Sequence, residues 1–110
     1  MRQLLTTFCL LVLAVMTWAT VAASLDRSVV EAGRELWSDL WFRATLADTY
    51  FAFLTFYLWV AYKEPGPLAR VGWLLAILLL GNFAMAAFLL RELRRLPPEA
   101  PLSALLLRRP

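Results

Sequence analysis

The sequence predicts an all-α integral membrane protein, with three transmembrane helices and an amphipathic interfacial helix between the first and second. Two observations predict this fold class. Of the 110 residues, 62% are hydrophobic, which is more than so short a chain can bury in a core of its own. These hydrophobic residues also gather in three long runs separated by charged segments. We therefore expect a single membrane domain whose excess apolar surface is covered by lipid.

The first hydrophobic run covers about residues 4–23 and contains no charged residue. At ~1.5 Å rise per residue, a helix of this length crosses the ~30 Å hydrocarbon layer of a bilayer. A cleaved signal peptide is the alternative, because Arg2 precedes the run and small residues at 21–23 suit cleavage. The length of the run and the presence of Trp18 favour a retained span. Cys9 lies inside the run, where we expect a small buried side chain rather than a reactive or lipidated thiol.

The segment at about residues 29–42 is amphipathic. Ser28 and Glu31 match a capping box, in which the serine accepts a hydrogen bond from the backbone amide three residues later, so a helix should begin at Val29. Apolar residues recur at spacings of three and four, while charged residues occupy the opposite side. We expect this helix to lie in the membrane interface, with Trp37 and Trp41 at headgroup depth. A solvated helical loop is the alternative.

The second and third runs cover about residues 44–62 and 69–90. The "KEPGP" segment between them predicts a tight turn, because proline ends a helix. A basic, proline-containing tail at 91–110 follows, and its last ten residues either rest on the membrane or are disordered. The residues that we expect to anchor the helices at the interfaces are aromatic or basic: Trp37, Trp41, Tyr62, Lys63, Arg91, Arg94 and Arg95.

The distribution of basic residues predicts the orientation, since Lys and Arg near the spans favour the cytoplasmic side. With three spans, Arg2, Lys63 and Arg70 share one side, and the other eight of the eleven basic residues share the opposite side. This count favours an N-terminus outside the cytoplasm. The overall charge of +3 makes anionic lipid headgroups the expected partner, and no nucleic-acid motif is present.

Asp48 is the one acidic residue inside the second run. It shares a helical face with Thr45, Ala52 and Thr55, so one side of this span is small and hydrogen-bonding. If the second and third spans form an antiparallel hairpin, Asp48 lies level with Asn82. We therefore predict an intramembrane polar site in which these two side chains approach each other. Its members are Asp48, Asn82, Thr45, Thr55 and Tyr50.

The role of Asp48 has several interpretations. It is either a structural acid held by the amide of Asn82, a carboxylate reached by Arg43 from the interface, or a proton carrier with a pKa raised by burial. The sequence contains no histidine, and no grouping of a nucleophile with a base, metal ligands or a phosphate-binding loop is recognisable. We expect no enzymatic activity, no cofactor and no metal site.

The motif "ATLAD" with Tyr50, together with "WVAYKE", resembles a family of short bacterial and plant multi-spanning membrane proteins that carries only a domain-of-unknown-function label. The resemblance covers roughly residues 35–109. It implies a membrane location and a retained first span, and it brings no known activity, substrate or cofactor. Asp48, Trp59, Tyr62 and the pair at 63–64 match the family pattern, which assigns them no role.

These observations lead to one functional expectation and two alternatives. We expect a non-enzymatic accessory or assembly component of the bacterial inner membrane that contacts another membrane protein or forms a homo-oligomer. The first alternative is an oligomeric proton or small-solute conduit built around Asp48. The second is a lysis-type pore former, suggested by the small size, the number of spans and the basic tail.

Overall fold

The structure is a computed structural model that describes residues 1–108. Most of these residues lie in helices. Arg109 and Pro110, the last residues of the predicted tail, lie outside this range. The elements in chain order are α1 (Arg2–Asp26), α2 (Val29–Leu36), α3 (Leu40–Lys63), α4 (Pro67–Leu80), α5 (Asn82–Arg95) and the 3-10 helix η1 (Leu102–Leu106). No strand occurs within residues 1–108, so the predicted all-α class is confirmed.

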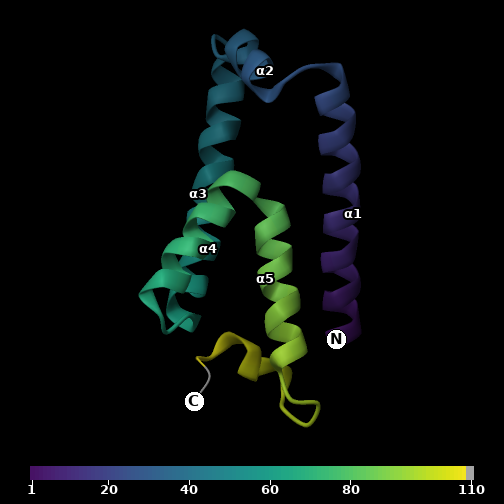
Figure 1. Cartoon of the computed structure of the whole chain (residues 1–110), viewed down its shortest axis with the longest axis vertical. Coiled ribbons are helices and arrows are strands. Elements are labelled where there is room, and N and C mark those ends of the chain that lie inside the picture. The colour runs from purple at the N-terminus through teal and green to yellow at the C-terminus, as the bar shows by residue number, and fades with distance from the viewer. Residues whose placement is uncertain (109–110) are drawn as a thin grey trace.

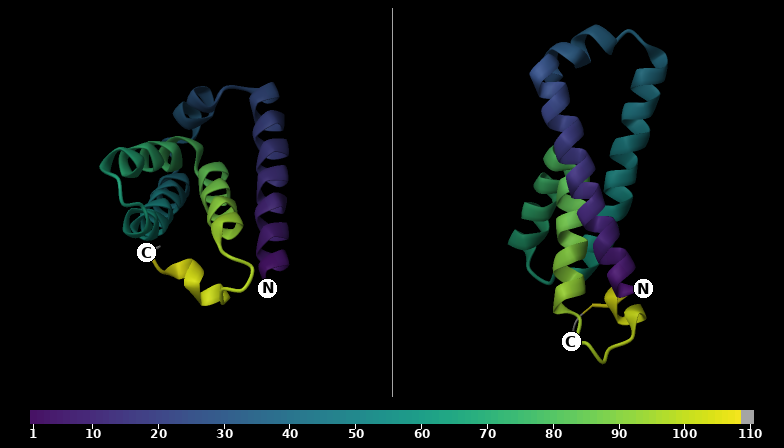
Figure 2. Two further views of the ribbon diagram at one scale, coloured as in Figure 1. Left: turned by 60° about the horizontal axis from the view of Figure 1, so that its bottom comes forward. Right: turned by 90° about the vertical axis from the view of Figure 1, so that its right-hand side faces the viewer.

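The helices form an elongated bundle whose longest extent is 50 Å. α1 runs from the N-terminus to α2, and α3 returns in the opposite direction (Figure 1). α4 then runs back along α3, and α5 reverses again to lie between that pair and α1 (Figures 1 and 2). We call the end that carries α2 the α2 end, and the end that carries Met1 and η1 the tail end.

Local capping explains where the first helices begin and end. The Ser28 hydroxyl oxygen accepts a hydrogen bond from the backbone N–H of Glu31 at 3.1 Å, which confirms the predicted start of α2. The predicted single helix over 29–42 is wrong, because α2 ends at Leu36. The Asp39 carboxylate accepts hydrogen bonds from the N–H groups of Trp41 and Phe42, at 2.9 and 3.3 Å, and so starts a new helix, α3.

The predicted third span over 69–90 is also wrong as a continuous helix. It is broken at Gly81, whose φ of 55° and ψ of −120° lie in a region that L side chains rarely adopt. A Cβ atom at this position would lie 2.7 Å from Cζ of Phe53, so the glycine also permits the close approach of α3. As a result α4 and α5 form a hairpin that extends along only part of α3 (Figure 1). Hydrophobicity alone could not predict this reversal, because glycine is common in continuous apolar helices.

Among residues 1–108, two helices are long and apolar enough to cross a membrane: α1 with 25 residues and α3 with 24. α4 has 14 residues and therefore measures only about 21 Å, which is too short for a full crossing. The structure thus supports two candidate spans where the sequence predicts three.

The hydrophobic core joins α3, α4 and α5 around Phe88, whose side chain is fully buried. Three aromatic rings meet the Phe88 ring edge to face, with centroid distances of 5.0 Å for Trp73, 5.3 Å for Trp59 and 6.2 Å for Phe56. Such aromatic pairs stabilise a core by roughly 0.5–1.5 kcal/mol each beyond the burial of their area. Cys9 of α1 is also buried, as predicted. This aromatic core holds the α4–α5 hairpin against α3.

Candidate functional site

Within residues 1–108, no hydrogen bond joins any two of the five side chains of the predicted polar site. Asp48, Asn82, Thr45, Thr55 and Tyr50 are all exposed. The Thr55 hydroxyl donates to the carbonyl of Phe51 on its own helix at 2.8 Å, and the Tyr50 hydroxyl donates to the carbonyl of Leu78 on α4 at 3.3 Å. Within residues 1–108, no hydrogen bond joins Asp48 to Asn82.

The break at Gly81 changes the surroundings that the sequence predicts for Asn82. α3 and α4 run antiparallel, since Tyr50 donates a hydrogen bond to Leu78 and Phe53 lies against Gly81. These contacts match the register from which the sequence predicts that Asp48 lies level with Asn82. However, Asn82 is the first residue of α5 rather than the continuation of α4. It lines an open hollow together with Leu11, Val12, Val15 and Met16 of α1. The amide therefore belongs to the α1 side of the bundle.

A buried cluster of charges lies instead at the tail end, where it joins the last residues of α3 to α5. We call it the tail-end cluster, and its members are Lys63, Glu64, Arg91 and Glu92. Nζ of Lys63 lies 3.3 Å from Oε1 of Glu92, and only 3% and 1% of these two side chains are exposed. Arg91 forms an ion pair with Glu64, and its Nε lies 3.8 Å from Oε2 of Glu92. Two cations thus balance two anions.

Aromatic rings line the cluster on the core side. The guanidinium of Arg91 lies 5.2 Å from the ring centroid of Trp73 and 5.3 Å from that of Phe88. Nζ of Lys63 lies 5.4 Å from the centroid of Trp59. Cation–π contacts of this kind stabilise desolvated cations, so the cluster and the aromatic core form one structural unit.

The segment around η1 folds across the tail-end cluster. Lys63 donates a hydrogen bond to the carbonyl of Leu105, whose side chain is buried. Nε1 of Trp59 donates to the carbonyl of Leu106 at 3.3 Å, and Nε of Arg108 donates to the carbonyl of Tyr62 at 2.7 Å. Through residue 108 the tail is therefore neither disordered nor separate from the bundle. These contacts hold residues 105–108 against the last residues of α3.

The residues predicted to be interfacial anchors fall into two groups. The side chains of Trp37, Trp41, Tyr62, Arg94 and Arg95 are exposed. Lys63 and Arg91 lie in the tail-end cluster, where each pairs with a glutamate instead of projecting outward. Their partners, Glu64 and Glu92, were not predicted from the sequence. The available signal was the adjacent basic and acidic residues, "KE" and "RE", at the ends of two apolar runs.

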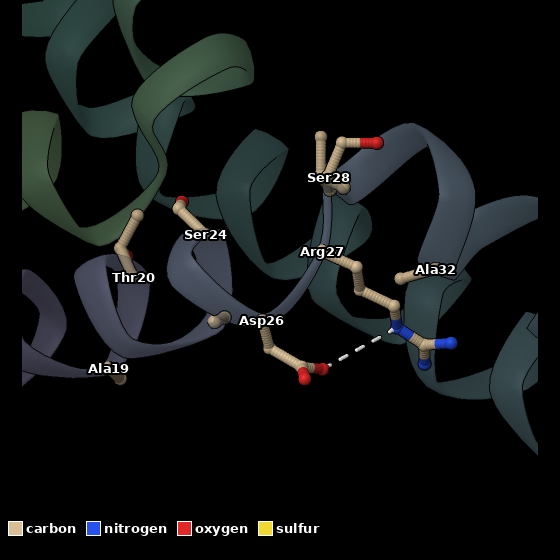
Figure 3. A pocket seen from close by; sticks show the side chains of 9 residues that line it. Ala19, Thr20, Ser24, Asp26, Arg27, Ser28 and Ala32 are labelled. Atoms are coloured by element: carbon tan, nitrogen blue, oxygen red, sulfur yellow. Dashed lines mark ion pairs between the residues drawn. The ribbon is translucent and has the colours of Figure 1, made fainter.

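A second feature is an open hollow where α1 meets α2 (Figure 3). Its lining includes Thr20, Ser24, Asp26 and Arg27. Nε of Arg27 lies 4.0 Å from the Asp26 carboxylate, and its guanidinium also pairs with Glu35. Because the cation is already engaged by two carboxylates, the hollow offers no free charge for an anionic ligand.

Residues 1–108 contain no group of three or more side chains suited to hold a metal ion. No family model matches the sequence, and searches of characterised proteins and of solved structures found no match either. The resemblance to a family of short membrane proteins therefore stays a prediction from the sequence.

Proposed function

We propose that this chain is an integral protein of the bacterial inner membrane that acts, without enzymatic activity, as an accessory or assembly component of a larger complex. Two helices with the length and composition of membrane spans, α1 and α3, support the membrane location. The α4–α5 hairpin then enters from the tail end and returns to it. Its backbone remains helical except at Gly81, as a low-dielectric environment requires.

The charge distribution supports an orientation with the tail end in the cytoplasm. The tail end collects seven described basic residues: Arg2, Lys63, Arg70, Arg91, Arg94, Arg95 and Arg108. The α2 end has three, Arg27, Arg34 and Arg43. Since basic residues favour the cytoplasmic side, this difference reverses the orientation predicted from three spans. The reversal follows from the break at Gly81, which returns the tail to the side of the N-terminus.

The observation that carries the assembly function is the exposure of polar side chains on a helix that we place in lipid. Thr45, Asp48 and Thr55 of α3 face away from the core of this chain. An aspartate at the centre of a transmembrane helix costs roughly 2.5–3.5 kcal/mol, and polar groups within spans usually face protein or water. Lipid tails offer no hydrogen bonds, so a neighbouring helix from another protein is the best cover for this face.

A conduit for protons or small solutes, formed by several copies of this chain, is the second candidate. The same exposure of Asp48 favours it, because the carboxylate would line a water-filled path in such an oligomer. Reconstituted vesicles with an internal pH-sensitive dye separate the two functions. A conduit gives proton flux that Asp48→Asn abolishes, whereas an assembly component gives the same low leak in both proteins.

Site-specific photo-crosslinking in the native membrane tests the assembly function. A photoreactive residue at position 55 on α3 should give a discrete crosslinked band containing a second protein. The same residue at position 79 on α4, where Leu79 is exposed and apolar, is the matched control and should react with lipid alone. If both positions give the same pattern, the proposed function is wrong.

A further inference from the structure

We propose that the partner covers α3 with a transmembrane helix that carries a lysine or arginine at the depth of Asp48. This inference rests on the proposed function and specifies the chemistry of the partner. The docking surface is a stripe of exposed residues on α3, Thr45, Asp48, Ala52 and Thr55, which we call the Asp48 stripe.

The Asp48 stripe has the shape required for close helix packing. Its side chains other than Asp48 are small, and small residues let the backbones of two helices approach each other. The same helical face continues toward the tail end as Trp59 and Tyr62, where Trp59 is half-buried and the chain adds contacts of its own through Leu106 and Arg108. The part of the face without such contacts runs from Thr45 to Thr55.

The charge of the stripe is unmatched within this chain. Asp48 has no ion pair among residues 1–108. It lies eight residues after Leu40, the first residue of α3, which places it ~12 Å along the helix axis from the α2 end. At that depth a carboxylate is poorly solvated, so an opposite charge on a neighbouring helix gives a stronger interaction than it would in water.

The basic residue nearest in sequence on α3, Arg43, is directed elsewhere. Its Nε donates a hydrogen bond to the carbonyl of Trp37 at 2.6 Å, and its guanidinium lies 5.4 Å from the centroid of the Trp37 ring. Arg43 is thus held toward the α2 end. At the other end of α3, Lys63 is paired with Glu92 and lies fifteen residues, ~23 Å, from Asp48.

A second copy of this chain is a poor match for the stripe. The described cations all lie near the α2 end or at the tail end, and none lies at the depth of Asp48. A parallel copy packed stripe to stripe would place two aspartates at the same depth, and like charges repel strongly in a low dielectric. Charge complementarity therefore favours a different protein with a basic residue inside its span.

The experiment uses the full-length protein in lipid vesicles, labelled with a fluorescent donor at its N-terminus. The probes are two synthetic transmembrane peptides of leucine and alanine with an acceptor, one containing a single lysine ~12 Å from one end and the other leucine at that position. Energy transfer on titration gives the association constant of each peptide. We expect the lysine peptide to bind at least about tenfold more tightly, because the charges pair in a low dielectric.

Three variants locate the effect. Asp48→Asn keeps the shape of the side chain but removes its charge, and it should abolish the preference for the lysine peptide. Asp48→Lys should instead prefer a peptide with aspartate at that position. Leu79→Ala on α4 is the control and should bind like the unmodified protein. Equal binding of the two peptides by the unmodified protein, or a preference that survives in Asp48→Asn, would overturn the inference.

The results also separate this inference from the proposed function. A discrete crosslink from position 55 in the native membrane, combined with no preference for the lysine peptide, would mean that a partner exists but lacks the basic residue. A clear peptide preference without that crosslink would show a cation-binding stripe in a protein that has no stable partner. The first outcome overturns the inference alone, and the second overturns the assembly function.

Discussion

Replacing Gly81 by alanine should destabilise the protein, although the same change inside a continuous helix would stabilise it. Two features of the structure determine this sign. The φ of 55° and ψ of −120° are strained for any L side chain, and such strain costs roughly 1–3 kcal/mol. The added Cβ would also lie 2.7 Å from Cζ of Phe53 and 3.1 Å from its Cε2, and overpacking of this kind typically costs about 1–3 kcal/mol.

We therefore expect Gly81→Ala to lower the free energy of unfolding by about 2–6 kcal/mol. Gly72→Ala is the matched control, because Gly72 lies within α4 and a Cβ there would meet nothing within 4 Å. Alanine is favoured over glycine in a helix by about 1 kcal/mol, so the control should be neutral or slightly more stable. Adding Phe53→Leu to Gly81→Ala should remove part of the contact penalty and leave the backbone strain.

Equilibrium unfolding in mixed detergent and SDS micelles, followed by tryptophan fluorescence, measures these differences. Trp59 and Trp73 pack against Phe88 in the core, so their emission should report loss of the hairpin. If Gly81→Ala is as stable as Gly72→Ala, or more stable than the unmodified protein, then α4 and α5 form one continuous helix and the re-entrant hairpin is refuted.

Three further predictions address the tail end and the orientation. Lys63→Met should cost about 3–5 kcal/mol in the same unfolding assay, because it removes the nearest counter-charge of the buried Glu92 carboxylate. Lys63→Met with Glu92→Leu should recover most of that loss, and equal losses in the single and the double variant would contradict a buried pair. Leu105→Ala should release η1 and therefore speed amide hydrogen exchange over residues 102–106, while exchange in α3 stays the same. If exchange at η1 does not change, η1 is not docked through Leu105. In intact cells, a membrane-impermeant maleimide should label Gly33→Cys at the α2 end but not Ser103→Cys at the tail end, and the opposite pattern would reverse the orientation.

Local features of the fold could be predicted from the sequence because they depend on neighbouring residues. The start of α2 at Val29 follows from Ser28, whose hydroxyl satisfies an amide three residues later. The turn between α3 and α4 follows from the prolines, and Pro67 occupies the first position of α4, where its missing N–H is harmless. The end of α2 is harder to predict, because the charged side chain of Asp39 suits the polar side of one helix over 29–42, although it caps the next helix.

The candidate site could not be predicted, because it depends on the direction of the chain after residue 80. A glycine in an apolar run is compatible with a straight span, and only its contact with Phe53 and its positive φ identify it as a reversal. Once α5 is assumed to continue α4, Asn82 is placed beside Asp48, while Glu92 is placed at the opposite end from Lys63. In the structure α5 returns, so Glu92 meets Lys63 and Asn82 lies on the α1 side.

The reversal at Gly81 also links the tail-end cluster to the exposure of Asp48. A third span of full length would extend α4 to the α2 end and cover more of α3 there, where polar side chains now lie open. Because the chain turns back, α5 places Arg91 beside Glu64 and Glu92 beside Lys63 at the tail end. Asp48, nearer the α2 end of α3, has no ion pair among residues 1–108. The four charges of the tail-end cluster thus neutralise one another, whereas the face of α3 around Asp48 presents a carboxylate for which we propose a partner helix.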